Sequence, residues 1–365
     1  MAKAILVTGA TGHQGGAVVD ALLSADSDGT KYIILAVTRD ASSSSATALL
    51  AKAPHKNLKL VEGNLDDVPA VFEAAKKILH STPATSHVAE GKSYAEAAAP
   101  AESDSPNEPS SKASPKPSST PESPSPSIYG VFSIQTSLGP GTSPSRETAQ
   151  GLALIDAAIA HSVTHFVYTS VDRGGNVASW TTPTSVPHFK TKYEIEQHLR
   201  DSTAEGKPGA GMTWTVLRPV AFMDNLEPGF VSKVFVAALK NYLGEKKKKL
   251  QWVAVADIGV FAEKAFGDPE KWKGNAVGLA GDELTMEGVD EAFMKVTGEP
   301  APKAYWLFGS ALTKMMKEMR VMLEWFAQEG YKVDIEEVRR QHPGLLNMEE
   351  WLAKKSKFVL KKEDL

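Results

Sequence analysis

The chain has no cysteine among its 365 residues, which excludes disulfide bonds, thiolate nucleophiles and thiolate metal sites. Its nine histidines are scattered without ligand spacing, so we expect no bound metal. No apolar run reaches the roughly 18 residues of a membrane span, and no signal-peptide pattern opens the chain. The net charge of -4 provides no general attraction to nucleic acid or to anionic membranes. These absences predict a cytoplasmic protein that binds neither nucleic acid nor membranes directly.

The composition is that of a globular protein, with 42% of the residues hydrophobic and 23% charged. Strand and helix patterns alternate in the first half, which is typical of a parallel sheet. The expected strands span residues 4–7, 32–38, 57–62, 128–134, 164–170 and 212–218. The expected helices between them include residues 68–79, 147–160 and 192–201. The pattern therefore predicts a doubly wound α/β fold.

The chain beyond residue 220 has a mixed pattern. Helical spacing is found at 231–243, 258–265, 286–296 and 313–328, with short strands at 250–253 and 276–279. We expect a smaller α/β subdomain over residues 221–365, from which some segments return to a core formed by residues 1–80 and 128–220.

The composition changes abruptly between residues 81 and 127, where Ser, Pro, Ala, Glu and Lys replace large apolar residues. Such a segment buries too little surface to offset the entropy lost on ordering. It is predicted to be a disordered insertion on a surface loop, which a fold tolerates because the cost of closing a loop grows slowly with length.

The most informative segment is the first strand and the turn after it. Glycines stand at positions 9, 12 and 15, and an amphipathic helix pattern follows at once. We expect Gly9 to adopt the backbone conformation that the tight turn requires. Gly12 should let phosphates approach the backbone, and Gly15 should let the helix pack closely on the strand. The helix N-terminus then offers unpaired N–H groups to a pyrophosphate.

The spacing of these glycines is G-x-x-G-x-x-G, which differs from the usual G-x-G-x-x-G of dinucleotide sites. A glycine-rich turn that binds nothing is therefore the alternative. The strand before the turn and the helix after it favour a dinucleotide site.

The glycine turn is the first of nine segments that follow one another along the chain: TGATGHQGG (8–16), EGNLD (62–66), YGVF (129–132), FVYTS (166–170), HFKTK (188–192), EIE (194–196), LRPVAFMDN (217–225), QWVAVADIG (251–259) and GDELT (281–285). Together they resemble the NmrA-like family of atypical short-chain dehydrogenase/reductases. The resemblance implies a Rossmann core that binds NADP or NAD, a smaller C-terminal substrate subdomain and a cleft between them. Family members include nitrogen-repression regulators, redox sensors and NADPH reductases, so the fold follows more directly than the function.

The end of the second strand bears on the choice of cofactor. Arg39 presents a planar fork of donors suited to the 2′-phosphate of NADP, although a solvated loop arginine is the alternative. Asp40 follows directly and suits the 2′-OH of NAD, unless it caps the next helix. We expect NADP(H), with Lys52 as a second phosphate contact, and NAD as the alternative.

The resemblance assigns further cofactor contacts. It implies that Thr11, His13 and Gln14 belong to the phosphate-binding turn, and that Asn64 and Leu65 lie beside the adenine.

The resemblance also identifies the catalytic candidates. Typical short-chain reductases use Tyr-x-x-x-Lys, in which the tyrosine is the acid and the lysine binds the nicotinamide ribose. Here Lys192 matches the lysine and Ser170 the upstream serine, but His188 replaces the tyrosine. His188 is either a proton donor or a polar residue in the loop before the helix. Lys192 is either a cofactor contact or a solvated lysine, and Ser170 either a catalytic or a structural hydroxyl.

Three functions remain open. The chain is an NADPH-dependent reductase of small carbonyl, quinone or enone substrates, a non-catalytic redox sensor that regulates a protein partner, or a scaffold with a structural nucleotide. A regulator of a transcription factor would also be found in the nucleus. Loss of the tyrosine favours a sensor, whereas retention of Lys192 favours hydride transfer, which mainly requires positioning. We expect the reductase.

Overall fold

The computed structural model describes residues 2–53, 55, 57–81, 127–136, 141–244, 247–304 and 317–361. Except for its first and last residues, the predicted insertion at 81–127 lies outside the described residues, as do residues 313–316 of the last predicted helix.

The core of the fold is a seven-stranded sheet in the order β3-β2-β1-β4-β5-β6-β9, in which all neighbouring strands are parallel. The strands are β1 (Lys3–Val7), β2 (Tyr32–Thr38), β3 (Leu58–Glu62), β4 (Ile128–Ser133), β5 (His165–Thr169), β6 (Thr213–Pro219) and β9 (Asn275–Leu279). This is the Rossmann order, extended at one edge by β9, and it confirms the predicted fold. The strand order reverses between β1 and β4, and ligands of such sheets bind where the carboxyl ends of those strands diverge.

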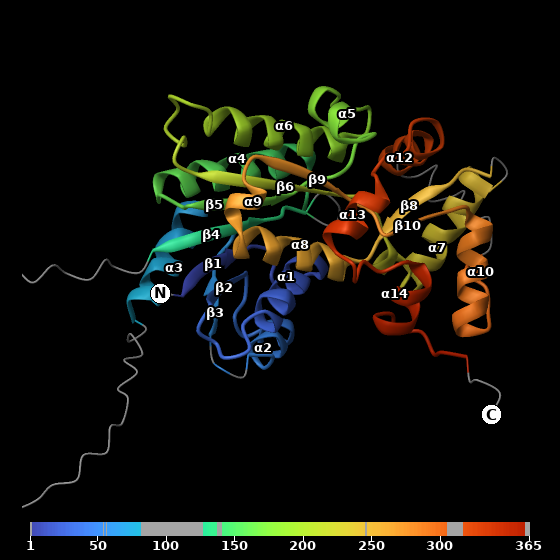
Figure 1. Cartoon of the computed structure of the whole chain (residues 1–365), viewed down its shortest axis with the longest axis horizontal. Coiled ribbons are helices and arrows are strands. Elements are labelled where there is room, and N and C mark those ends of the chain that lie inside the picture. Colours follow the sequence, from blue (N-terminus) through green and yellow to red (C-terminus); the bar gives the residue numbers. More distant parts are fainter. Residues whose placement is uncertain are drawn as a thin grey trace, which may run out of the picture.

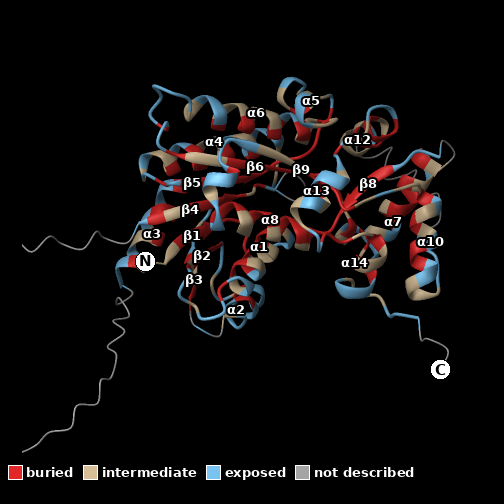
Figure 2. Ribbon diagram, in the orientation of Figure 1, coloured by how far each residue is buried: buried red, intermediate tan, exposed pale blue. Residues whose placement is uncertain are grey.

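Helices cover both faces of this sheet (Figure 1). One face packs against α1 (His13–Ser24), α2 (Ser44–Leu50) and α8 (Val255–Gly267), and the other against α3 (Val68–Ser81), α4 (Pro144–Ala160) and α6 (Pro187–Ser202). Alternate residues of β1 point to opposite faces, so Ile5 and Val7 join one core cluster while Ala4 and Leu6 join the other. Figure 2 shows that the strands of this sheet are largely buried, in red. Burial on both faces explains why these strands have continuous apolar sequences.

Two of these helices approach each other unusually closely. A Cβ atom at Gly259 of α8 would lie 2.3 Å from the carbonyl oxygen of Ala17 in α1. Only glycine fits at this position. The contact holds α1, the helix that follows the glycine turn, against α8, which lies far along the chain.

A smaller body is built on a second sheet of β7 (Ala221–Phe222), β8 (Leu250–Val253) and β10 (Asp282–Leu284), in the order β10-β8-β7. Its helices include α7 (Phe230–Leu239), α10 (Met286–Thr297), α12 (Lys317–Gln328) and α14 (Met348–Lys354). Met223, Trp252 and Trp351 are fully buried in its core cluster.

The structure departs from the predicted elements in several places. The last sheet helix begins at Pro187 rather than at residue 192, with proline in the first turn, where its missing N–H costs nothing. The helix predicted at 231–243 ends at Leu239 and continues as a π-helical turn, Lys240–Gly244. The pattern missed β7, β10, α5 (Asn176–Thr181), α9 (Pro269–Trp272), α13 (Ile335–Gln341), α14 and a 3₁₀ turn at Met223–Leu226.

Candidate functional site

The glycine turn lies at the point where the strand order reverses. Gly9 adopts a φ of +59°, and the N–H of Gly12 donates to its carbonyl oxygen at 2.9 Å. The Thr8 hydroxyl accepts from the N–H of Ile134 at 2.8 Å, which ties the turn to the end of β4. A Cβ atom at Gly15 would lie 2.3 Å from the Gly9 carbonyl oxygen, so glycine is required for this approach of helix to turn.

The N-terminus of α1 offers donors to a ligand. Gly12 is its N-cap, and no side chain caps the helix. The N–H groups of the first turn, from His13 to Gly15, therefore have no intrahelical partner, and the helix dipole favours an anion there. Thr11 and His13 are exposed beside this end. The side-chain oxygen of Gln14 accepts from the hydroxyl of Thr169, the last residue of β5, at 2.7 Å.

Arg39 is free to bind an anion at the end of β2. It is exposed, and no described residue hydrogen bonds to it or forms an ion pair with it. Asp40 instead accepts from the N–H and the hydroxyl of Ser42, at 2.8 and 2.6 Å. The cap of α2 is Ser43, so Asp40 shapes the turn before that helix. Lys52 is already paired with Asp20 at 2.8 Å.

The loop after β3 is held by one ion pair and by hydrogen bonds. The amide nitrogen of Asn64 donates to Asp66 at 3.1 Å, and Arg146 of α4 binds both oxygens of Asp66. Hydrogen bonds from Arg146 and Gln150 lower the pKa of the Asp66 carboxyl from 3.8 to about 2. Leu65 is half-buried against the core.

Lys192 is the best-defined cation of the site. Its Nζ lies 2.8 Å from Oε1 of the buried Glu147 on α4 and 3.5 Å from the carbonyl oxygen of Gln135, just after β4. The Tyr168 ring lies 5.7 Å from the same ammonium. Lys192 therefore lies beside the end of β4, where the strand order reverses; the space between the glycine turn (residues 9–15) and Gln135 is called the crevice below. Its charge is balanced by a carboxylate, and the reading of a solvated helix lysine is wrong.

Tyr168 does not replace the missing acid. Its side chain is fully buried and its hydroxyl has no hydrogen-bond partner among the described residues. Burial, followed by the charge of Glu147, raises the pKa of its phenol well above 10. A phenol held in this way does not exchange protons with a ligand near neutral pH.

Ser170 is joined to a buried charge network. Its hydroxyl accepts from Nη1 of Arg173 at 3.2 Å. Arg173 and Arg218 both bind Glu196, at 2.7 and 2.6 Å, and the three side chains are completely buried. These contacts assign Ser170 a structural partner and make Arg218, in the segment matched by the resemblance, part of the core.

His188 lies in the first turn of α6, not in the loop before a helix, and this corrects that prediction. The cause is Pro187, which begins the helix at the residue before His188. Nδ1 of His188 lies 2.8 Å from Oε1 of Glu318 on α12. Lys192 stands one helical turn further on, so both side chains lie on the same side of α6.

Glu147 and Glu318 were missed by the sequence interpretation. Each pairs with a candidate residue far away in the chain, and neither has a local motif. Met223 and Trp252, which lie in segments matched by the resemblance, are core residues of the smaller body.

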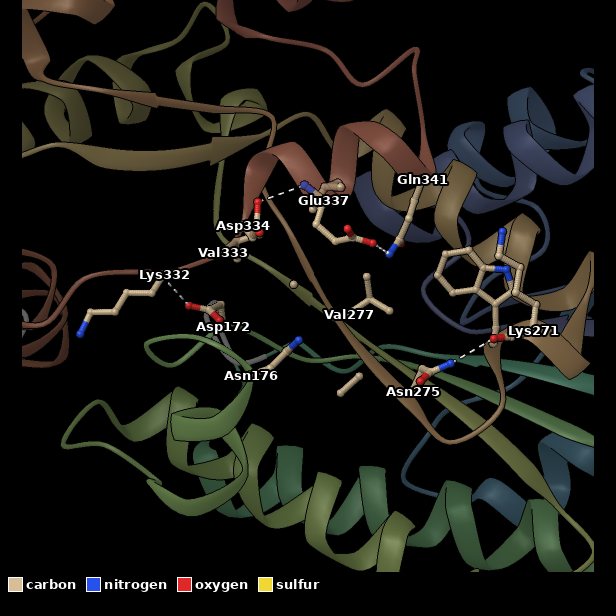
Figure 3. A pocket seen from close by; sticks show the side chains of 14 residues that line it. Asp172, Asn176, Lys271, Asn275, Val277, Lys332, Val333, Asp334, Glu337 and Gln341 are labelled. Atoms are coloured by element: carbon tan, nitrogen blue, oxygen red, sulfur yellow. Dashed lines mark hydrogen bonds between the residues drawn. The ribbon is translucent and has the colours of Figure 1, made fainter.

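A cavity of about 540 Å³ runs along β9, the edge strand of the large sheet. Figure 3 shows that its polar side chains already pair with neighbouring residues: Asn275 donates to Lys271, Gln341 donates to Glu337, and Asp334 accepts from the Glu337 N–H. β9 lies three strands beyond β4, so this cavity is separate from the crevice at the glycine turn.

In the part of the chain that the structure describes, no helix has the length and apolarity to cross a bilayer. The same residues contain no group of three or more His, Cys, Asp or Glu side chains suited to a metal ion.

The strand order, the glycine turn and the helix that follows it define a Rossmann-type α/β protein. The NmrA-like family model matches residues 1–103 and 118–352. The chain belongs to the NmrA-like family, which confirms the resemblance.

Two curated relatives match part of the chain. The NmrA-like family domain-containing oxidoreductase malD of Malbranchea aurantiaca is 26% identical over 213 residues, which cover 50% of this chain and 59% of the relative. An NmrA-like family domain-containing protein of Dictyostelium discoideum is 23% identical over 157 residues, covering 42% and 51%. The matches thus span only about half of each of these relatives.

Solved structures match almost the whole chain. NmrA, a negative transcriptional regulator solved with NAD, has 16% identity and a TM-score of 0.59, covering 97% of this chain and 95% of its own. An NADPH-dependent quinone oxidoreductase of Escherichia coli, solved with NADPH, has 18% identity and a TM-score of 0.59, covering 96% and 98%. At these identities the likeness shows the fold.

Proposed function

We propose that this chain binds NADP(H) at the glycine turn and reduces a small carbonyl, quinone or enone substrate. The observation that carries the proposal is the arrangement at the point where the strand order reverses. The free N–H groups of α1 and the ammonium of Lys192 flank the same crevice, since Thr8, next to Gly9, hydrogen bonds to Ile134 and Lys192 hydrogen bonds to the adjacent Gln135. The solved quinone oxidoreductase and NmrA bind NADPH and NAD within the same fold.

The residues of the crevice fit the two ends of the dinucleotide. The first turn of α1 holds the pyrophosphate, and Arg39, which has no partner among the described residues, binds the 2′-phosphate of NADP. Lys192, held by Glu147, donates to the nicotinamide ribose. The cofactor, when bound, supplies hydride, and His188 holds a proton for the reduced substrate. Ser170 has a supporting role, because its bond to Arg173 joins the end of β5 to the buried network of Arg173, Glu196 and Arg218.

NADPH oxidation in the presence of quinones, enones and ketones tests this function. Lys192→Ala is compared with Lys190→Ala, which removes an exposed lysine of the same helix whose Nζ lies 3.9 Å from Glu194. We expect turnover that is lost at position 192 and kept at position 190. Failure of the wild-type protein to bind either NADPH or NADH would overturn the proposal.

A non-catalytic redox sensor acting on a protein partner is the second candidate. It is favoured by the Lys192–Glu147 ion pair, because a lysine whose charge is balanced is less able to activate an acid. Tight NADPH binding without turnover of any acceptor would favour the sensor.

A further inference from the structure

We propose that Glu318 is the positioning residue for His188, holding the imidazole so that Nε2 delivers the proton during reduction. The inference rests on the proposed function. It adds a residue from the C-terminal body to a site that otherwise belongs to the Rossmann core.

The contact is short and sheltered. Nδ1 of His188 and Oε1 of Glu318 are 2.8 Å apart, with 13% and 27% of the two side chains exposed. The hydrogen bond from His188 lowers the pKa of the Glu318 carboxyl below 4.5, so Glu318 is ionised near neutral pH. An ionised carboxylate at Nδ1 keeps a proton on that nitrogen and so fixes which ring nitrogen faces away from Glu318.

Aromatic packing fixes the same pair of helices. The Phe189 ring meets the His188 ring edge-on at 4.8 Å and the Trp325 ring of α12 at 5.1 Å. The orientation of α12, and with it Glu318, is thereby set relative to the first turn of α6.

Nε2 is the nitrogen left for a substrate. No described residue hydrogen bonds to it, whereas Nδ1 is occupied. The i, i+4 spacing places it on the same side of α6 as Lys192, one turn away. A donor there lies near a substrate that faces the nicotinamide.

The proton balance is simple for a carbonyl substrate. If NADPH supplied the hydride, a C–H bond of its dihydronicotinamide would break to leave NADP⁺, a C–H bond would form on the substrate carbon, and the π pair of the C=O bond would move onto oxygen. That oxygen takes the proton from Nε2, whose N–H bond breaks. One proton from the solvent then restores the proton on Nε2, so the overall reaction consumes one proton from solution.

Kinetics of Glu318→Gln test the positioning role. We expect kcat to fall at least about tenfold and His188→Gln to lower it about 10²-fold, which is the lower end for a positioned proton donor. KM and NADPH affinity should change little. The double variant should be no slower than His188→Gln alone, because Glu318 acts through His188.

Glu324→Gln is the matched control, because Glu324 lies on the same helix and pairs with Arg320 at 3.4 Å near the surface. It should leave kcat unchanged. Wild-type kcat in Glu318→Gln, or independent effects that multiply in the double variant, would overturn the inference while leaving the proposed function intact. If the wild-type protein reduces no acceptor, the proposed function and the donor role fail together.

A second readout does not depend on turnover. Imidazole ¹⁵N and ¹H spectra of the NADPH-bound protein should contain a downfield Nδ1–H signal that is absent from His188→Gln and displaced in Glu318→Gln. An Nδ1 without a proton in the wild-type protein would refute the positioning role.

Discussion

The two ends of the crevice differ in how their polar groups are satisfied. At the end formed by the glycine turn, the first-turn N–H groups of α1 and the guanidinium of Arg39 have no partner among the described residues. At the other end, Lys192, Ser170 and His188 each contact a charged side chain of the protein. Groups that bind a polyanion must remain free until it arrives, whereas groups that align a reacting atom need support beforehand.

The two largest expected effects are on stability, and the first removes the carboxylate that supports Lys192. Glu147→Ala leaves the ammonium of Lys192 without a counter-charge in a largely buried site. We expect the free energy of unfolding to fall by about 3 kcal/mol, the lower end for a broken buried ion pair. Urea denaturation measures it. Lys192→Met in the same chain should restore part of the loss, and an unchanged midpoint in Glu147→Ala would mean that the pair contributes nothing.

The glycine turn provides the next test. Gly15→Ala places a Cβ atom 2.3 Å from a backbone oxygen, whereas Gly12→Ala places one at 3.3 Å, a distance that small shifts relieve. We expect Gly15→Ala to lower the free energy of unfolding by about 3 kcal/mol through overpacking, and Gly12→Ala to lower it much less. Equal losses in urea denaturation would contradict the packing role of Gly15.

Arg39→Ala tests the free end directly. Loss of a hydrogen-bonded contact to a charged phosphate costs about 1.5–3 kcal/mol, so NADPH affinity should fall about 10–100-fold, with little change for NADH. Calorimetric titration measures both. Lys52→Ala is the control, since Lys52 already pairs with Asp20. An equal loss for the two nucleotides would exclude Arg39 as the residue that binds the 2′-phosphate.

The smallest effect is a pH dependence. Because the folded-state pKa of Asp66 is lowered from 3.8 to about 2, its stabilising contribution is complete above pH 4 and is lost as the pH falls through 2. Asp66→Asn should therefore flatten the acid-induced drop in thermal midpoint across this window. A slope identical to that of the wild-type protein would show that the bridge to Arg146 does not stabilise the fold.

The sequence predicted the large sheet because its strands are buried on both faces and the glycine turn has a local pattern. It missed helices with short sequences, although their caps were visible: Asn347 and Glu350 form a capping box, and Asp334 caps α13. The partners of Lys192 and His188 had no comparable signal, since pairing between distant residues follows from how helices pack. Cofactor contacts at residues such as Asn64 and His13 stay predictions.

The close contact between α1 and α8 also bears on how the protein is made. The apolar face of α1 is covered by α8, and β9, which completes the sheet, is later still in the chain. A ribosome that has released only the first half of the chain therefore presents α1 without the helix that covers it. We expect the emerging chain to need protection by chaperones until residues near Gly259 have left the exit tunnel.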